Sequence, residues 1–183
     1  MSLTYSSMLP LGTKLIAFEL IDTVSEKNFS SDEFEISKPT LIMFICNHCP
    51  YVIHYHSEIQ RISQDYKDQI NMVAISSNDV DNYPQDGPQQ MQDLWEDLGI
   101  SFPYLFDETQ MVAKAYKAEC TPEFYLFDVN RKLVYRGRLD ESSPNSTTLP
   151  SGKDLRDAIE NLFNDREISL EQFPSMGCNI KWK

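Results

Sequence analysis

Basic side chains are scarce in this chain. It has 16 Lys and Arg against 28 Asp and Glu, which gives a formal net charge of −12 at pH 7. Such a surface repels phosphate backbones and anionic lipid headgroups, so we expect neither nucleic acid nor a membrane as a partner. The sequence also lacks an apolar run of about 18 residues and the basic, then apolar, start of a secretory signal. From these absences we expect a cytoplasmic protein.

Cysteine is also scarce, with four residues in 183. That number is too small for a secreted scaffold stabilised by several disulfides. Two of the four form a C-x-x-C pair at Cys46 and Cys49. In a reducing compartment such a pair indicates redox chemistry or a metal site more than a structural bridge.

Apolar material is sufficient and evenly spread. Hydrophobic residues make up 41% of the chain and aromatic residues 11%, enough to offset the entropy of ordering it. There is no internal repeat, low-complexity tract or linker, and the length fits one domain with a full core. We therefore predict a single domain over 1–183, with an N-terminal extension over 1–13 and an irregular C-terminal tail over 165–183.

The apolar patterns alternate between strand and helix. The unbroken run TLIMFI (40–45) is typical of a central strand buried on both faces. Gly99 is expected to close one helix, while Asp107 and Ser151 are expected to cap two others. The predicted strands are 15–20, 40–45, 70–75, 123–128 and 132–137, and the predicted helices are 51–68, 89–98, 108–118 and one after Ser151. The sequence thus predicts an α/β domain with a central mixed β-sheet flanked by helices.

The Cys-Asn-His-Cys-Pro segment at 46–50 stands where the buried strand passes into a helix. Unpaired N–H groups and the positive end of the dipole at a helix N-terminus favour a thiolate. We predict that Cys46 attacks a disulfide and that Cys49 resolves the product, with Pro50 suited to the first turn. His48 would stabilise the Cys46 thiolate and so make the disulfide more oxidising. We expect a Cys46 pKa below the roughly 8.5 of a free thiol.

The order of strand, C-x-x-C and helix, followed by Thr121-Pro122 at the start of a strand, resembles the thioredoxin superfamily. The segments LGTK–AFEL and DETQMVAKAY are similar to its AhpC/TSA–redoxin branch. More narrowly, FICNHCPYV, CTPEFYLFD, YRGRLD and GCNIKWK together resemble a group of bacterial thioredoxin-like proteins. The resemblance implies a thioredoxin-like fold and a cis peptide at Pro122. It also implies that Thr121 and Pro122 line a groove for the extended backbone of a substrate.

The function that follows is dithiol–disulfide exchange with protein or small-molecule disulfides, without an organic cofactor or metal. Two departures from the family bear on it. Thioredoxin has a Trp before its first Cys and a buried acid six residues before it, where this chain has Ile45 and Thr40. The proton acceptor for the resolving thiol is therefore either missing or supplied from elsewhere in the chain. The His before the second Cys is closer to the oxidase DsbA.

Two alternatives stay open. One is a peroxiredoxin-like thiol peroxidase with antioxidant activity at Cys46: Pro39 stands at the right distance, but Met43 occupies the position of the required hydroxyl. The other is a non-catalytic metal-binding or redox-sensing module. Its donors would be Cys46, His48 and Cys49 with one distant ligand. His54 and His56 point away from each other on a helix, and we expect both at the surface. A loop that we expect to be solvated could also hold a cation with Asp79, Asp81 and Asp86.

The remaining cysteines are possible auxiliary thiols. Cys120 directly precedes Thr121 and is expected to pack as a small hydrophobic side chain. Cys178 lies in the tail and could fold back to pass electrons to or from Cys46 and Cys49. Nothing in the sequence indicates the oligomeric state.

Overall fold

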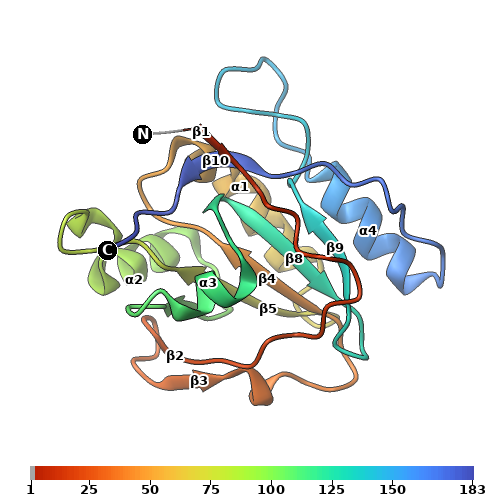
Figure 1. The fold of residues 1–183 in the computed structure, drawn as a ribbon, viewed down its shortest axis with the longest axis horizontal. Coiled ribbons are helices and arrows are strands. Elements are labelled where there is room, and N and C mark those ends of the chain that lie inside the picture. The colour runs from red at the N-terminus through yellow and green to blue at the C-terminus, as the bar shows by residue number, and fades with distance from the viewer. Residues whose placement is uncertain (1–2) are drawn as a thin grey trace.

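A mixed β-sheet with helices on both faces forms the body of the protein (Figure 1). The computed structural model describes residues 3–183. The large sheet has the strand order β3-β2-β6-β5-β4-β8-β9, and a small sheet has the order β1-β10-β7. The strands are β1 (Leu3–Tyr5), β2 (Glu19–Asp22), β3 (Asn28–Ser30), β4 (Thr40–Phe44), β5 (Asn71–Ser76), β6 (Tyr104–Phe106), β7 (Cys120–Thr121), β8 (Glu123–Phe127), β9 (Leu133–Gly137) and β10 (Met176–Asn179). The helices are α1 (Pro50–Asp65), α2 (Pro88–Leu98), α3 (Met111–Tyr116) and α4 (Lys153–Phe163), with short 3₁₀ turns at η1 (Ser31–Glu33) and η2 (Pro84–Asp86).

Strand β4 lies in the interior of the large sheet, between β5 and β8, as its unbroken apolar run predicts. It pairs in parallel with β5 and antiparallel with β8, and all five of its residues are buried. The pairing with β8 ends at Phe44 opposite Glu123. This register brings the segment after β4, which begins the C-x-x-C, next to the Thr121-Pro122 turn before β8.

Two apolar clusters fill the space on either side of the sheet. Leu41 and Met43 face one cluster, while Ile42 and Phe44 face the other, because successive side chains of a strand point to opposite faces. Residues of α1, α2 and α4 complete the first cluster, and residues of α3 and the N-terminal segment complete the second. Burying a large apolar side chain contributes about 1.5–3 kcal/mol to the free energy of folding.

The predicted α/β class, with a central mixed sheet flanked by helices, is confirmed.

Some predicted boundaries are wrong. The strand expected over 15–20 starts only at Glu19. The helix expected over 108–118 is the shorter α3, and its N-cap is Gln110 in a left-handed conformation. Asp107 still supports that helix, because its buried carboxylate accepts the amide of Ala113 at 2.9 Å. Gly152, not Ser151, is the N-cap of α4, and the predicted stop of α2 at Gly99 is confirmed by its left-handed backbone.

The prediction of an irregular tail over 165–183 is wrong at Met176–Asn179, where the chain forms β10. This strand lies between β1 and β7 and pairs antiparallel with both. The predicted extension over 1–13 contributes β1, while residues 1 and 2 lie outside the described residues. The partners of β10 are more than fifty residues away along the chain, so no local pattern marks the strand.

Within residues 3–183, none of the helices is long and apolar enough to cross a membrane.

Candidate active site

The backbone holds Cys46 and Cys49 against the Thr121-Pro122 turn. Cys46 follows β4, and its Sγ lies 3.3 Å from Thr121 Oγ1. Cys49 Sγ lies 3.2 Å from the carbonyl oxygen of Thr121. The peptide bond between Thr121 and Pro122 is cis, as the resemblance implies. The turn that was expected to hold a substrate therefore contacts both sulfurs of the C-x-x-C.

Cys49, and not Cys46, occupies the N-cap of α1. The helix begins at Pro50, and the amides of Val52 and Ile53 donate to the carbonyl oxygen of Cys49 at 2.9 and 3.0 Å. Pro50 is the first residue of the helix. Proline has no backbone N–H, but an N–H at this position would have no partner within the helix, so nothing is lost. The favourable field of the helix N-terminus therefore acts mainly on Cys49.

The expectation of a lowered pKa at Cys46 is wrong. The pKa of Cys49 is lowered well below that of a free thiol, because Cys178 and Cys46 hydrogen-bond to its sulfur and the helix amide of Val52 faces it. The pKa of Cys46 is raised by its hydrogen bond to Cys49, by burial and by the Asp86 carboxylate. The lowered pKa therefore belongs to Cys49 and not to Cys46.

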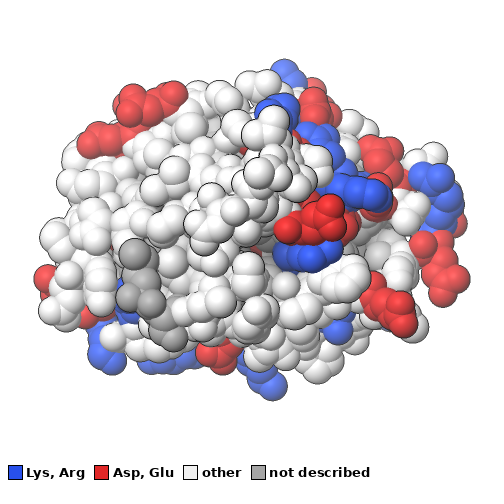
Figure 2. Space-filling view, turned by 90° about the horizontal axis from the view of Figure 1, so that it is seen from above, with Lys and Arg blue, Asp and Glu red and all other residues white. Residues whose placement is uncertain are grey.

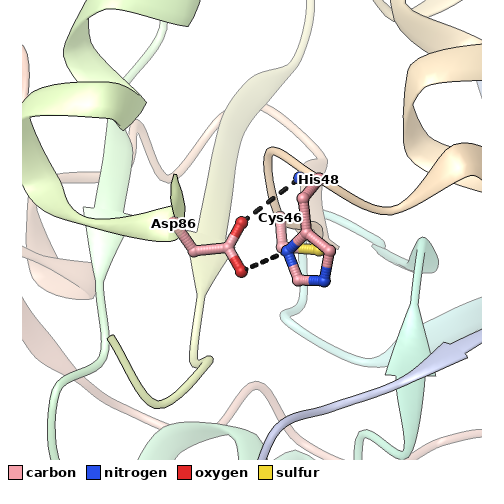
Figure 3. Close-up of side chains that lie close together, drawn as sticks. All are labelled: Cys46, His48 and Asp86. Carbon is pink, nitrogen blue, oxygen red and sulfur yellow. Dashed lines mark hydrogen bonds and ion pairs between the residues drawn. The ribbon is translucent and has the colours of Figure 1, made fainter. Parts of the chain in front are cut away.

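His48 is held by a buried aspartate. Its Nδ1 lies 2.6 Å from Asp86 Oδ2, and its ring stacks on Tyr83 with the planes 7° apart. Asp86 also accepts the backbone amides of Asn47 and His48 at 2.8 and 3.2 Å and the side-chain amide of Asn78 at 2.8 Å. Figure 3 shows the carboxylate facing the loop that joins the two cysteines. Asp86 thus fixes both the loop and the imidazole.

Asp86 was expected in a solvated loop, and the structure corrects this. Its side chain is fully buried at η2, while Asp81 of the same loop is exposed. The sequence offers no signal that separates these two aspartates, because both lie in one polar, turn-rich stretch. Asp86 becomes a site residue only when the loop folds over the C-x-x-C segment.

A possible metal-binding group is formed by Cys46, His48 and Asp86, whose donor atoms all lie within 4.8 Å of one another. Among residues 3–183 no other group of three His, Cys, Asp or Glu side chains meets this condition. A structural zinc ion takes four ligands. His54 and His56 lie outside the group and are half-buried rather than exposed. His54 Nε2 is 2.9 Å from Ser142 Oγ. His54 and His56 therefore do not join the C-x-x-C, whereas Asp86 supplies a distant donor next to Cys46 and His48.

Glu123 is a buried acid directly after the cis proline, and sequence reasoning assigned it only to a strand. Its carboxylate accepts hydrogen bonds from Ser6 Oγ, from Tyr125 OH at 2.7 Å and from the amide of Glu119 at 3.1 Å. Burial raises the pKa of Glu123 in spite of these bonds. The nearby thiol of Cys120 is fully buried, and burial raises its pKa as well. Cys120 therefore stays protonated and packs as a small apolar group, as expected.

We expect the Glu123→Gln variant to be more stable than the parent at pH 7, by about 1–3 kcal/mol of unfolding free energy. A carboxyl whose folded pKa is raised contributes fully below its unfolded pKa and costs stability as the pH rises through the folded value. The amide keeps an acceptor for Glu119 and can donate to the two hydroxyls, which can reverse their roles. Urea unfolding at pH 4 and pH 7 measures the gain, which should be larger at pH 7. An equal change in the exposed Glu108→Gln control would contradict the prediction.

A cavity of ≈ 310 Å³ adjoins the cis proline. Its walls include Tyr55, Pro122, Phe124, Arg138 and Phe173. Figure 2 views the molecule from the top of Figure 1: charged side chains gather toward one side, and much of the remaining surface is uncharged. Apolar side chains contribute most of the lining of the cavity, together with Arg138, Asp140 and Glu141.

The chain was compared with known proteins. The family model named Redoxin matches residues 10–152. The thiol-disulfide oxidoreductase YkuV of Bacillus subtilis (strain 168) is 27% identical over 100 residues, which are 52% of this chain and 64% of that protein. The alignment thus spans less than two thirds of that relative.

Two solved structures match over nearly the full length. A conserved protein from Geobacillus kaustophilus is 45% identical with a TM-score of 0.97, covering 100% of this chain and 97% of that one. A protein from Sinorhizobium meliloti 1021 is 38% identical with a TM-score of 0.95, covering 98% of both chains. At 24% identity, a domain of a Bacteroides thetaiotaomicron protein shares the fold with a TM-score of 0.65, covering 85% of this chain and 97% of that one.

Proposed function

Because the chain belongs to the Redoxin family, we propose that it is a thiol–disulfide oxidoreductase working by dithiol–disulfide exchange at Cys46 and Cys49. The observation that carries the proposal is the contact of both sulfurs with Thr121, next to the cis peptide bond of Pro122. A pair of thiols within reach of each other at a helix N-terminus can form and release a mixed disulfide.

Cys46 is the attacking thiol in this mechanism. Both sulfurs are almost fully buried. We assign the attack to Cys46 because Cys49 Sγ is already in contact with the carbonyl of Thr121 and with the sulfurs of Cys46 and Cys178. The Cys49 thiolate accepts the proton of Cys46 as Cys46 forms a bond to one substrate sulfur. The other substrate sulfur leaves as a thiolate and takes that proton. Cys49 then attacks Cys46, which releases the reduced substrate and leaves the Cys46–Cys49 disulfide.

The substrates proposed are protein or small-molecule disulfides, and the proposed compartment is the cytoplasm, which cell fractionation would test. His48 acts as a positioning and tuning residue, since Asp86 holds its ring close to Cys46. No organic cofactor or metal takes part in the exchange.

The reduction potential of the Cys46–Cys49 couple tests the proposal. We expect a two-electron couple above thioredoxin's value of about −270 mV, because the stabilised Cys49 thiolate favours the reduced form. Titration in graded glutathione buffers, with thiol alkylation and mass detection, gives the value, and metal content is measured on the same sample. A protein that shows no titratable couple, or that binds a stoichiometric metal at Cys46, would be a binding module.

A thiol peroxidase is the second candidate, and one contact favours it. Met43 is buried in the core and offers no hydroxyl, but Thr121 Oγ1 lies 3.3 Å from Cys46 Sγ. Against this stands the raised pKa of Cys46, since peroxide reacts with a thiolate. Antioxidant activity belongs to this second candidate, and peroxide consumption by the reduced protein distinguishes it from the first.

A further inference from the structure

A third cysteine, 129 residues away along the chain from Cys49, contacts the redox pair. Cys178 Sγ lies 2.9 Å from Cys49 Sγ. Cys178 is only 5% exposed and sits in β10, opposite Thr121 of β7 and Leu3 of β1. Its position is therefore set by strand pairing on both sides.

The residues after β10 also fix this cysteine. The amide of Ile180 donates to the carbonyl of Glu119 at 3.1 Å, and the amide of Lys181 donates to Asn78 Oδ1 at 2.8 Å. The carbonyl of Lys181 accepts the amide of Asp79 and the side-chain amide of Gln110, both at 2.8 Å. A buried segment with so many specific bonds does not fray like a free terminus.

Strand β10 occupies the place expected for a substrate. Thr121, next to the cis Pro122, was expected to line a groove for the extended backbone of a substrate. In this structure Thr121 pairs antiparallel with Cys178 of the same chain. Gly177 permits this approach, because a Cβ there would lie 2.0 Å from the carbonyl oxygen of Thr121. The chain thus presents its own cysteine to the redox pair from the position of a bound substrate.

We propose that Cys178 is a third redox-active thiol, which exchanges with the Cys46–Cys49 disulfide to form a Cys49–Cys178 disulfide. This inference rests on the proposed function, which supplies the disulfide. In the step, the Cys178 thiolate attacks Cys49 Sγ, the Cys49–Cys178 bond forms and the Cys46–Cys49 bond breaks. Cys46 leaves as a thiolate and takes the proton that Cys178 lost. The step has no net oxidation, and it regenerates a free Cys46 while the chain stays oxidised.

The pKa of Cys178 depends on whether Cys49 is reduced or oxidised. In the reduced protein the Cys49 sulfur raises the pKa of Cys178, both by accepting its thiol proton and by like charge. Both effects end when Cys49 enters a disulfide, after which burial still raises the pKa of Cys178 and Lys181 still lowers it. Oxidation of Cys49 therefore removes the largest effect that raises the pKa of Cys178, and Cys178 remains in contact with the sulfur that it would attack.

The test oxidises the full chain with glutathione disulfide in graded glutathione buffers, followed by acid quenching, alkylation and mapping of non-reduced tryptic peptides. Cys178 lies in a different tryptic peptide from the other two cysteines, so a Cys49–Cys178 link joins two peptides. We compare the parent with Cys46→Ser, Cys178→Ser and the Cys46→Ser/Cys178→Ser double variant. Cys46→Ser should form the Cys49–Cys178 disulfide, and the double variant should accumulate at least about tenfold more Cys49–glutathione adduct.

Different variants test the role of Cys178 and the proposed oxidoreductase function. If the Cys46→Ser variant keeps Cys178 free and holds as much Cys49–glutathione adduct as the double variant, Cys178 is only a packing residue. If the Cys178→Ser variant, which retains Cys46 and Cys49, forms no Cys46–Cys49 disulfide and reduces no protein disulfide, the proposed function fails instead. Cys120 serves as the internal control and should be alkylated only after denaturation, because it is fully buried.

Discussion

The Cys46→Ser variant should lose the reduction of a protein disulfide such as those of insulin, with a rate lower by on the order of 10³-fold or more. The reason is chemical: a serine hydroxyl at this position cannot exchange with a disulfide, and Cys49 in this variant is left in contact with Cys178, with which it can pair. The measurement is the turbidity that follows reduction of insulin by dithiothreitol, with each variant added in catalytic amount.

The Cys49→Ser variant should behave differently, because it retains the attacking thiol. We expect it to accumulate a mixed disulfide between Cys46 and the substrate, visible as an adduct on non-reducing gels. The control is Cys120→Ala, whose side chain is buried and protonated and whose activity should stay within about twofold of the parent. An adduct on Cys49 in the Cys46→Ser variant that turns over at the parent rate would reverse the roles assigned to the two thiols.

The Gly177→Ala variant should lose about 2–4 kcal/mol of unfolding free energy, the cost of a severe clash in a packed region. The added Cβ would lie 2.0 Å from the carbonyl oxygen of Thr121 and 2.8 Å from its carbon, both in the backbone. No rotamer change relieves such a contact, so β10 must move away from β7. That movement would also separate Cys178 from Cys49.

Urea unfolding measures the loss of stability, and hydrogen exchange of the β10 amides locates it. The matched control is Gly12→Ala, where φ is +80° but nothing lies within 4 Å of the added Cβ. Backbone strain alone should cost that control about 1–2 kcal/mol, without faster exchange in β10. If β10 exchanges no faster in Gly177→Ala than in the control, the close approach of Gly177 to Thr121 does not hold the small sheet together.

Local sequence determined the main strands and the place of the redox pair. The run at 40–45 is apolar at every position, and a segment of that length buried on both faces can only be central in a sheet. The apolar stripe after Pro50 shows the helical period, so the C-x-x-C had to stand at a junction of strand and helix. Each of these properties involves neighbours within a few residues, and a pattern in the sequence records it.

The predicted helix start at residue 51 is one residue from the observed start at Pro50, but the wrong cysteine was placed at the helix terminus. The helix-terminus field was assigned to Cys46, whereas the N-cap is Cys49. The raised pKa of Cys46 depends on the sulfur of Cys49, on burial and on the Asp86 carboxylate. Electrostatic effects act through space, and their sources here come from η2 and from the neighbouring thiol rather than from the helix alone.

The tertiary structure alone decided three features of the site. Asp86 reaches the loop from η2, Glu123 enters a closed pocket with Ser6 and Tyr125, and Cys178 arrives through β10. Aspartate and glutamate are usually exposed to solvent, and a cysteine is usually a small apolar group in the core. The contacts of these three side chains form only when distant parts of the chain come together in the fold. Sequence determined which residues could form a redox pair, because propensity and burial are local. The fold decided which charge, acid and third thiol surround the pair, because those contacts exist only after distant strands and loops meet.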